Sequence, residues 1–238
     1  MSRSTRSWLS RRMAAGRSRR RHQLLRVRLR LQRAGWAILR TVLTMALPFF
    51  LLVTGSVLSH RVLATPGWVS TQIGCVIATI CVALLGARLW RRWTGRDRLR
   101  EISRNVALPV VLLFVIYSLG WVTSPEAKSP EIRDLYHDLH PTLRLAIGTA
   151  TLTDPHVVVT EISRNRADYT RMGLTPISNS LHFEQTDGWV HAVDLRTRGR
   201  SEVRNRLLQL YFRAMGLRAL RHGGTGDHLH VALPRPWR

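Results

Sequence analysis

Residues 36–58 have the sequence WAILRTVLTMALPFFLLVTGSVL, an apolar run with one charged residue, Arg40. Two further apolar runs follow at residues 69–87 and 106–122. As helices that rise about 1.5 Å per residue, the three runs would be about 34, 28 and 26 Å long, comparable with a bilayer core of about 30 Å. A domain of this size cannot surround three such helices. The sequence therefore predicts an all-α membrane region with three transmembrane helices across residues 36–122.

The distribution of arginines predicts how these spans are oriented. Residues 1–35 contain twelve arginines and no acidic residue, and the link after the second run contains seven more. The link between the first two runs has only Arg61. Because basic loops stay in the cytoplasm, we expect residues 1–35 to be a basic cytoplasmic segment and residues 123–238 to lie outside the cytoplasm. Tryptophans mark the expected boundaries, as in an aromatic belt; they are Trp36, Trp68, Trp90 and Trp121.

The charge of the whole chain follows from the same segments. In 238 residues, 37 Lys and Arg stand against 14 Asp and Glu, which gives a formal charge of +23 and makes an ordinary soluble enzyme unlikely on composition. A basic leader of this kind would also suit nucleic acid. Since it directly precedes a span, topology and contact with anionic membrane lipids explain it better, and we predict no nucleic-acid partner. Both cysteines, Cys75 and Cys81, lie in the second apolar run, so no disulfide framework is expected.

The region beyond the spans has the balanced charge of a folded domain. From Glu126 onward it carries sixteen Lys and Arg and twelve Asp and Glu. Its apolar periodicity and capping residues predict an α+β domain over residues 123–238. The expected helices are residues 130–139, 141–149, 164–172 and 201–215, and the expected strands are residues 156–162, 191–196 and 228–233.

Four short motifs in this domain carry candidate chemistry. They are VTEISR at residues 159–164, SLH at 180–182, AVDL at 192–195 and DHLH at 227–230. Asp194 stands in an otherwise apolar strand, where a carboxylate has to be paired, hydrogen-bonded or bound to a metal. His228 and His230 are two positions apart, so they share one face of a strand. Two histidines and one carboxylate form the usual protein ligand set of a hydrolytic zinc ion.

In this order the motifs resemble those of the zinc D-alanyl-D-alanine metallopeptidases. That family includes the vancomycin-resistance D,D-peptidases, the phage L-Ala-D-Glu endolysins and the hedgehog signalling domain. The resemblance covers residues 157–233, which is most of the predicted domain at residues 123–238, called the outer domain below. It implies a zinc-peptidase-like α+β fold in which His182, Asp194 and His230 bind Zn²⁺.

The resemblance also implies roles for the neighbouring residues. Asp227 would be the catalytic acid and base, with His228 able to share that work. Arg164 would bind the substrate or stabilise the oxyanion, and Ser180 would support the first ligand. His182 and Asp194 are twelve positions apart, more than is usual in the family, which indicates a loop inserted at residues 184–188. His191 is the alternative first ligand.

Together these features predict a multi-pass protein of the bacterial cytoplasmic membrane with a periplasmic or otherwise extracytoplasmic peptidase domain. Its expected reaction is hydrolysis of amide bonds in peptidoglycan stem peptides or crosslinks. Two alternatives remain open. The domain could be catalytically inactive and bind cell-wall peptide, or the chain could be an interaction subunit with a membrane-protein partner, because one span would suffice to anchor a peptidase.

Overall fold

The computed structural model describes residues 3–120, 127–164, 173, 179–224 and 226–237. The burial and contacts of side chains are described from Arg28 onward. It divides into two compact units, residues 1–46 and 47–238. The first unit is helical from Arg3 and belongs to the long helix α1, Arg3–Leu63. Everything that bears on a functional site lies in the second unit.

Three helical segments are long and apolar enough to cross a membrane, as the sequence predicts. They are Arg28–Leu63 within α1, Gly67–Thr94, which is α2, and Leu99–Gly120. The third consists of α3 (Leu99–Ile102), a π-helical turn η1 (Ser103–Ala107) and α4 (Leu108–Gly120). Each helix extends beyond the predicted apolar run because the basic flanking residues are also helical.

Glycines let the spans approach each other and the outer domain. A Cβ at Gly74 of α2 would clash with Ser56 and Leu52 of α1, so only glycine permits this crossing. A Cβ at Gly148 would likewise clash with Ser118 of α4. Gly148 belongs to α6 (Pro141–Thr153), a helix buried along most of its length. The outer domain is therefore built directly on the ends of the spans.

Hydrogen bonds reinforce this junction. The hydroxyl of Tyr136 donates to the Ser118 carbonyl at 2.9 Å, and Arg144 Nη1 donates to the Leu119 carbonyl at 2.8 Å. At the other end of the domain, the Trp237 N–H donates to the Arg61 carbonyl at 2.8 Å, in the last turn of α1. The first and last segments of the outer domain are thus both tied to spans.

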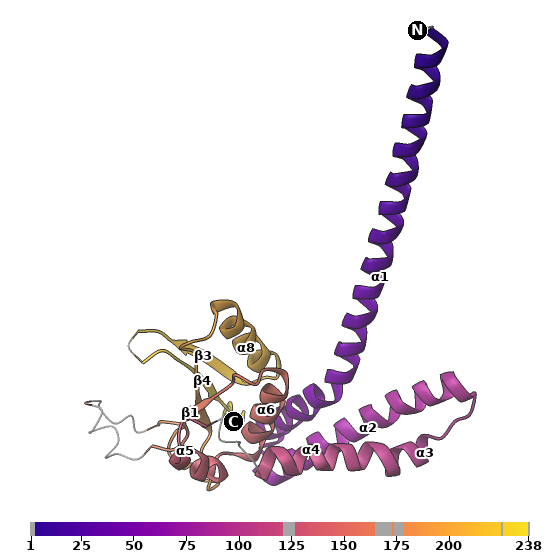
Figure 1. Ribbon diagram of the computed structural model, residues 1–238. Helices are drawn as coiled ribbons and strands as arrows, with labels where there is room; N and C mark the ends of the chain where they lie inside the picture. Colours follow the sequence, from indigo (N-terminus) through magenta and orange to yellow (C-terminus); the bar gives the residue numbers. More distant parts are fainter. Residues whose placement is uncertain (1–2, 121–126, 165–172, 174–178, 225, 238) are drawn as a thin grey trace. The chain divides into compact units, whose positions relative to one another are not determined.

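The outer domain has the predicted α+β layout (Figure 1). Its four-stranded antiparallel sheet has the order β1-β2-β4-β3, and α8 packs against β3. The strands are β1 (Val159–Glu161), β2 (Ala192–Arg196), β3 (Arg218–His222) and β4 (His228–Ala232). The helices are α5 (Pro130–Asp134), the 3₁₀ turn η3 (Leu135–Asp138), α6 and α8 (Glu202–Ala214).

The predicted elements match this layout with specific differences. The strands around Asp194 and His230 and the helix after Ser201 are confirmed, and the Ser201 side chain caps α8 by accepting from the Arg204 N–H. The predicted helix at 130–139 is instead one turn of α-helix followed by a 3₁₀ turn. The first strand is shorter than predicted, since His156 lies in a turn closed by Asp154. The predicted helix at 164–172 lies outside the described residues.

Candidate metal centre

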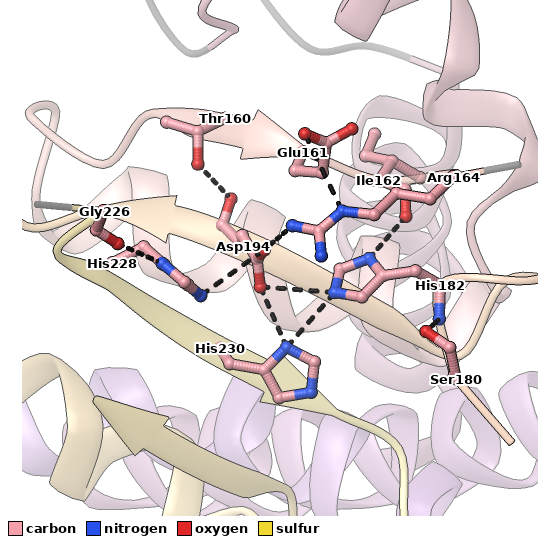
Figure 2. A network of polar contacts seen from close by, with 10 residues as sticks. All are labelled: Thr160, Glu161, Ile162, Arg164, Ser180, His182, Asp194, Gly226, His228 and His230. Carbon is pink, nitrogen blue, oxygen red and sulfur yellow. Dashed lines mark hydrogen bonds and ion pairs between the residues drawn. The ribbon is translucent and has the colours of Figure 1, made fainter. Parts of the chain in front are cut away.

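The two central strands bring the candidate ligands together. Asp194 in the middle of β2 is the direct antiparallel partner of His230 in the middle of β4. His182 comes from the loop before β2, and two backbone hydrogen bonds fix its place. The Arg164 N–H donates to the His182 carbonyl at 3.0 Å, and the His191 N–H donates to the Leu181 carbonyl at 2.9 Å. The three side chains therefore converge although 48 positions separate His182 from His230 (Figure 2).

One atom from each of these residues forms a small triangle. His182 Nε2 lies 3.2 Å from His230 Nδ1 and 3.3 Å from Asp194 Oδ1. The third edge, His230 Nδ1 to Asp194 Oδ1, is 2.8 Å. His182 and Asp194 are buried, with 4% and 2% of their surface exposed. Two imidazole nitrogens and a carboxylate oxygen thus face one point in a largely dry environment.

The hydrogen bonds of His182 determine which of its nitrogens faces this point with a lone pair. His182 Nδ1 lies 2.7 Å from the Ile162 carbonyl, which can only accept, so Nδ1 carries the proton. The Nε2 lone pair then faces Asp194 Oδ1 at 3.3 Å. Two lone pairs at this distance repel unless a proton or a metal cation lies between them. A ligating histidine held through its other N–H by a backbone carbonyl is the usual arrangement in metal sites.

The second oxygen of Asp194 faces a guanidinium and an imidazole. Arg164 Nη2 donates to Oδ2 at 2.8 Å, and His228 Nε2 lies 3.5 Å from the same oxygen. Burial alone would raise the pKa of the Asp194 carboxyl. Interactions with the neighbouring His182, His230 and His228 outweigh burial, so its pKa lies well below the ordinary value. Asp194 is therefore a carboxylate at any physiological pH.

Further residues contact the three candidate ligands or line a cavity next to them. The Ser180 hydroxyl accepts a hydrogen bond from the His182 N–H at 3.3 Å, next to the first ligand. A cavity of about 400 Å³ opens onto the cluster. It is lined by Arg164, Asn179, Ser180, Leu181, His182, Asp194, His222, His228 and His230. His222 was not predicted from the sequence. It stacks on His228 with ring centroids 4.9 Å apart, and burial together with the charges of His228 and His230 lowers its pKa.

Asp227 is placed differently from the other predicted residues. Its carboxylate accepts two hydrogen bonds from Arg221, at 3.0 and 2.9 Å, and it is not among the residues that line the cavity. Hydrogen bonds from Arg221 and Thr197 lower its pKa to about 2. A carboxylate of such low pKa is a weak proton acceptor at neutral pH. Its role as the catalytic base stays a prediction of the family resemblance.

His191, the alternative first ligand, belongs to a second cluster with His140 and Asp187. His191 Nε2 lies 3.0 and 2.9 Å from the two oxygens of Asp187, and His140 Nε2 lies 4.0 Å from Asp187 Oδ2. His140 Nδ1 accepts from the Thr142 N–H at 3.2 Å, so the proton of the neutral ring is on Nε2. That nitrogen cannot bind a metal in this tautomer. The loop at residues 184–188 thus joins a hydrogen-bonded histidine cluster.

The second cluster should make folding sensitive to acid. Burial, with repulsion from His191, His60 and Arg144, lowers the pKa of His140 to about 2. Below about pH 6.5 the unfolded chain binds a proton at His140 and the folded chain does not. The free energy of unfolding therefore decreases by up to about 1.4 kcal/mol for each unit by which the pH is lowered. We expect unfolding of the detergent-solubilised protein to need less denaturant at pH 5.5 than at pH 7.5. His140→Gln should reduce this difference, and an unchanged difference would contradict the assignment.

The triangle fits a zinc ion. Ligand atoms about 2.0–2.1 Å from a tetrahedral ion lie about 3.3–3.4 Å from one another. Two edges of the triangle, 3.2 and 3.3 Å, already have this length. The third, 2.8 Å, is that of the hydrogen bond between His230 and Asp194 and needs to open by about half an ångström. Two neutral imidazoles and one carboxylate are also the donor set of catalytic zinc sites, in which a fourth position stays open.

Comparison with known proteins adds no assignment. No family model matches the chain, and no curated protein or solved structure has significant similarity to it.

Proposed function

We propose that the chain is a membrane-anchored zinc metallopeptidase whose outer domain hydrolyses amide bonds in peptidoglycan peptides. The observation that carries this proposal is the convergence of His182 Nε2, Asp194 Oδ1 and His230 Nδ1 within 3.3 Å of one another beside a cavity. The order of the motifs, which resembles the zinc D-alanyl-D-alanine metallopeptidases, supports the reaction. The arginine distribution supports the orientation, which brings this cavity to the side of the membrane where peptidoglycan lies.

Within this proposal His182, Asp194 and His230 hold the ion, and Zn²⁺ would supply a Lewis acid for the amide carbonyl and for the attacking water. The fixed Nδ1–H of His182 and the pairing of Asp194 with Arg164 keep two ligands oriented before the ion arrives. The ligands lie on paired strands and on a loop hydrogen-bonded to them, so little rearrangement is needed for binding.

Proton transfer is assigned to His228. Its Nδ1 faces the Gly226 carbonyl and its Nε2 faces the cavity edge beside Asp194 Oδ2. Nε2 would accept the proton of the attacking water and return it to the leaving amine, the general acid and base role that histidine most often has in enzymes. The Arg164 guanidinium would place positive charge near the oxygen that becomes negative in the transition state.

The direct test uses the full chain, purified in a neutral detergent and loaded with Zn²⁺. Incubation with purified crosslinked muropeptides should give products one amide bond shorter, identified by mass spectrometry. Removal of zinc with a chelator should stop the reaction, and added zinc should restore it. Stoichiometric zinc without any product from stem peptides or crosslinks would refute the peptidase proposal.

A second candidate function is a non-catalytic domain that binds cell-wall peptide through the same metal. The observation that favours it is the ion pair between Asp227 and Arg221. This pair occupies the carboxylate that would be the catalytic base according to the family resemblance. In the same experiment this function gives retention of muropeptides by the zinc-loaded protein with no cleavage.

A further inference from the structure

A second cavity, of about 530 Å³, lies where the outer domain meets the end of the first span. Arg61 borders it from the last turn of α1, and Arg213, Gly216 and Arg218 border it from the end of α8 to the start of β3. Arg235 borders it from the segment after β4. The candidate span that contains Arg61 ends at Leu63. The cavity therefore lies at the depth where a span leaves the hydrocarbon and meets the lipid headgroups.

The cavity is strongly and uniformly positive. Four of its lining residues are arginines: Arg61, Arg213, Arg218 and Arg235. Among the residues that the structure describes, no carboxylate lies within ion-pair distance of any of the four. Other arginines of the same domain are paired, such as Arg200 with Asp154 and Arg206 with Glu202. Four arginines without a carboxylate partner in the described residues thus border this one cavity.

Contacts with the protein orient three of these arginines and leave most of their N–H donors available to a ligand. Arg213 Nε donates to the Ala219 carbonyl at 2.9 Å, and Arg235 Nη2 reaches the Asn179 carbonyl at 3.4 Å. The Arg61 guanidinium stacks over the Trp237 ring at 4.6 Å. Its Nε is buried and has no hydrogen-bond partner within the described part of the chain. A guanidinium has five N–H donors, so each arginine keeps several.

We propose that this cavity binds a phosphate group, and that the phosphate belongs to the headgroup of an anionic membrane lipid. A guanidinium group can bind two phosphate oxygens at once, and several guanidinium groups around one cavity can contact a tetrahedral anion from different sides. The volume is that of a site for a small molecule. Leu217 and Pro234 also line the cavity and give the glycerol part of a lipid an apolar contact. The position at the end of a span makes lipid phosphate the most concentrated source.

The test measures lipid retained by the full chain in neutral-detergent micelles that contain phosphatidylglycerol or phosphatidylcholine. Native mass spectrometry should show one tightly retained phosphatidylglycerol and no comparable phosphatidylcholine. Arg218→Gln and, separately, Arg61→Gln should each weaken retention at least about tenfold, since each removes a charge-assisted contact. Arg218 is exposed, so its substitution does not endanger folding.

Arg198→Gln is the matched control, because it removes one exposed arginine of the same domain outside the cavity. The arginine-rich leader is common to every variant, so its own attraction for anionic lipid cancels. Equal retention by wild type and both cavity variants, or an equal loss in Arg198→Gln, would overturn the proposal. Inorganic phosphate that protects the wild type but not Arg218→Gln against thermal unfolding, with no retained lipid, would overturn the lipid source and assign the cavity to free phosphate.

Discussion

We expect Asp194→Asn to abolish the proposed stoichiometric zinc binding and, with it, the proposed zinc-dependent hydrolysis. The substitution keeps the size of the side chain and an oxygen that can accept from Arg164, but it removes the negative charge from the ligand triangle. Loss of an outer-shell partner commonly costs about 10–100-fold in metal affinity, so loss of the anionic ligand should cost more than about 100-fold. Isothermal titration with Zn²⁺ and metal analysis after gel filtration would measure both affinity and stoichiometry.

The control for this substitution is Asp187→Asn in the second histidine cluster. Asp187 binds His191 and belongs to no contact of the triangle, so this variant should keep one zinc per chain. His182→Ala and His230→Ala should behave like Asp194→Asn. One tightly bound zinc in Asp194→Asn, with wild-type affinity, would show that the ion is held elsewhere and would remove the basis of the proposed centre.

His228→Gln separates metal binding from proton transfer. The glutamine cannot exchange a proton, so we expect zinc content to stay at one per chain and kcat to fall by about 10²- to 10⁴-fold, the usual contribution of a general base. Zinc analysis and single-turnover cleavage together distinguish this outcome from simple misfolding.

Asp227→Asn is the matched substitution, one position away. Because Arg221 already holds Asp227, we expect it to lower kcat less than tenfold. A loss as large as that of His228→Gln, with zinc retained, would identify Asp227 as the base that the family resemblance implies and would assign His228 a supporting role.

The spans and the strands that carry Asp194 and His230 could be predicted because their apolar patterns are strong. The three apolar runs are long, and β2 alternates around Asp194 with neighbours buried on both faces. Strand β3 could not be predicted, because its residues 218–222 include only two apolar side chains, Ala219, which is buried, and Leu220, which is exposed. It is an edge strand held by pairing with β4. Missing this strand also meant missing His222.

The other features that could not be predicted from the sequence depend on contacts between segments that are far apart along the chain. The partner of Asp227 is Arg221, which lies in the unpredicted strand, so the position of Asp227 three residues before His230 could not reveal this ion pair. His191 and His140 are far apart along the chain, and their shared cluster depends on the turn at residues 184–190. Composition and periodicity carry little information on such pairings.

The bond from the Trp237 N–H to the Arg61 carbonyl limits how far the candidate metal centre can lie from the end of α1. Seven residues lead from His230 to Trp237, a tether of at most about 25 Å even if fully extended. The candidate metal centre therefore stays close to the end of the first span. In the proposed function, this tether would confine hydrolysis to wall strands next to the membrane and would leave more distant layers out of reach.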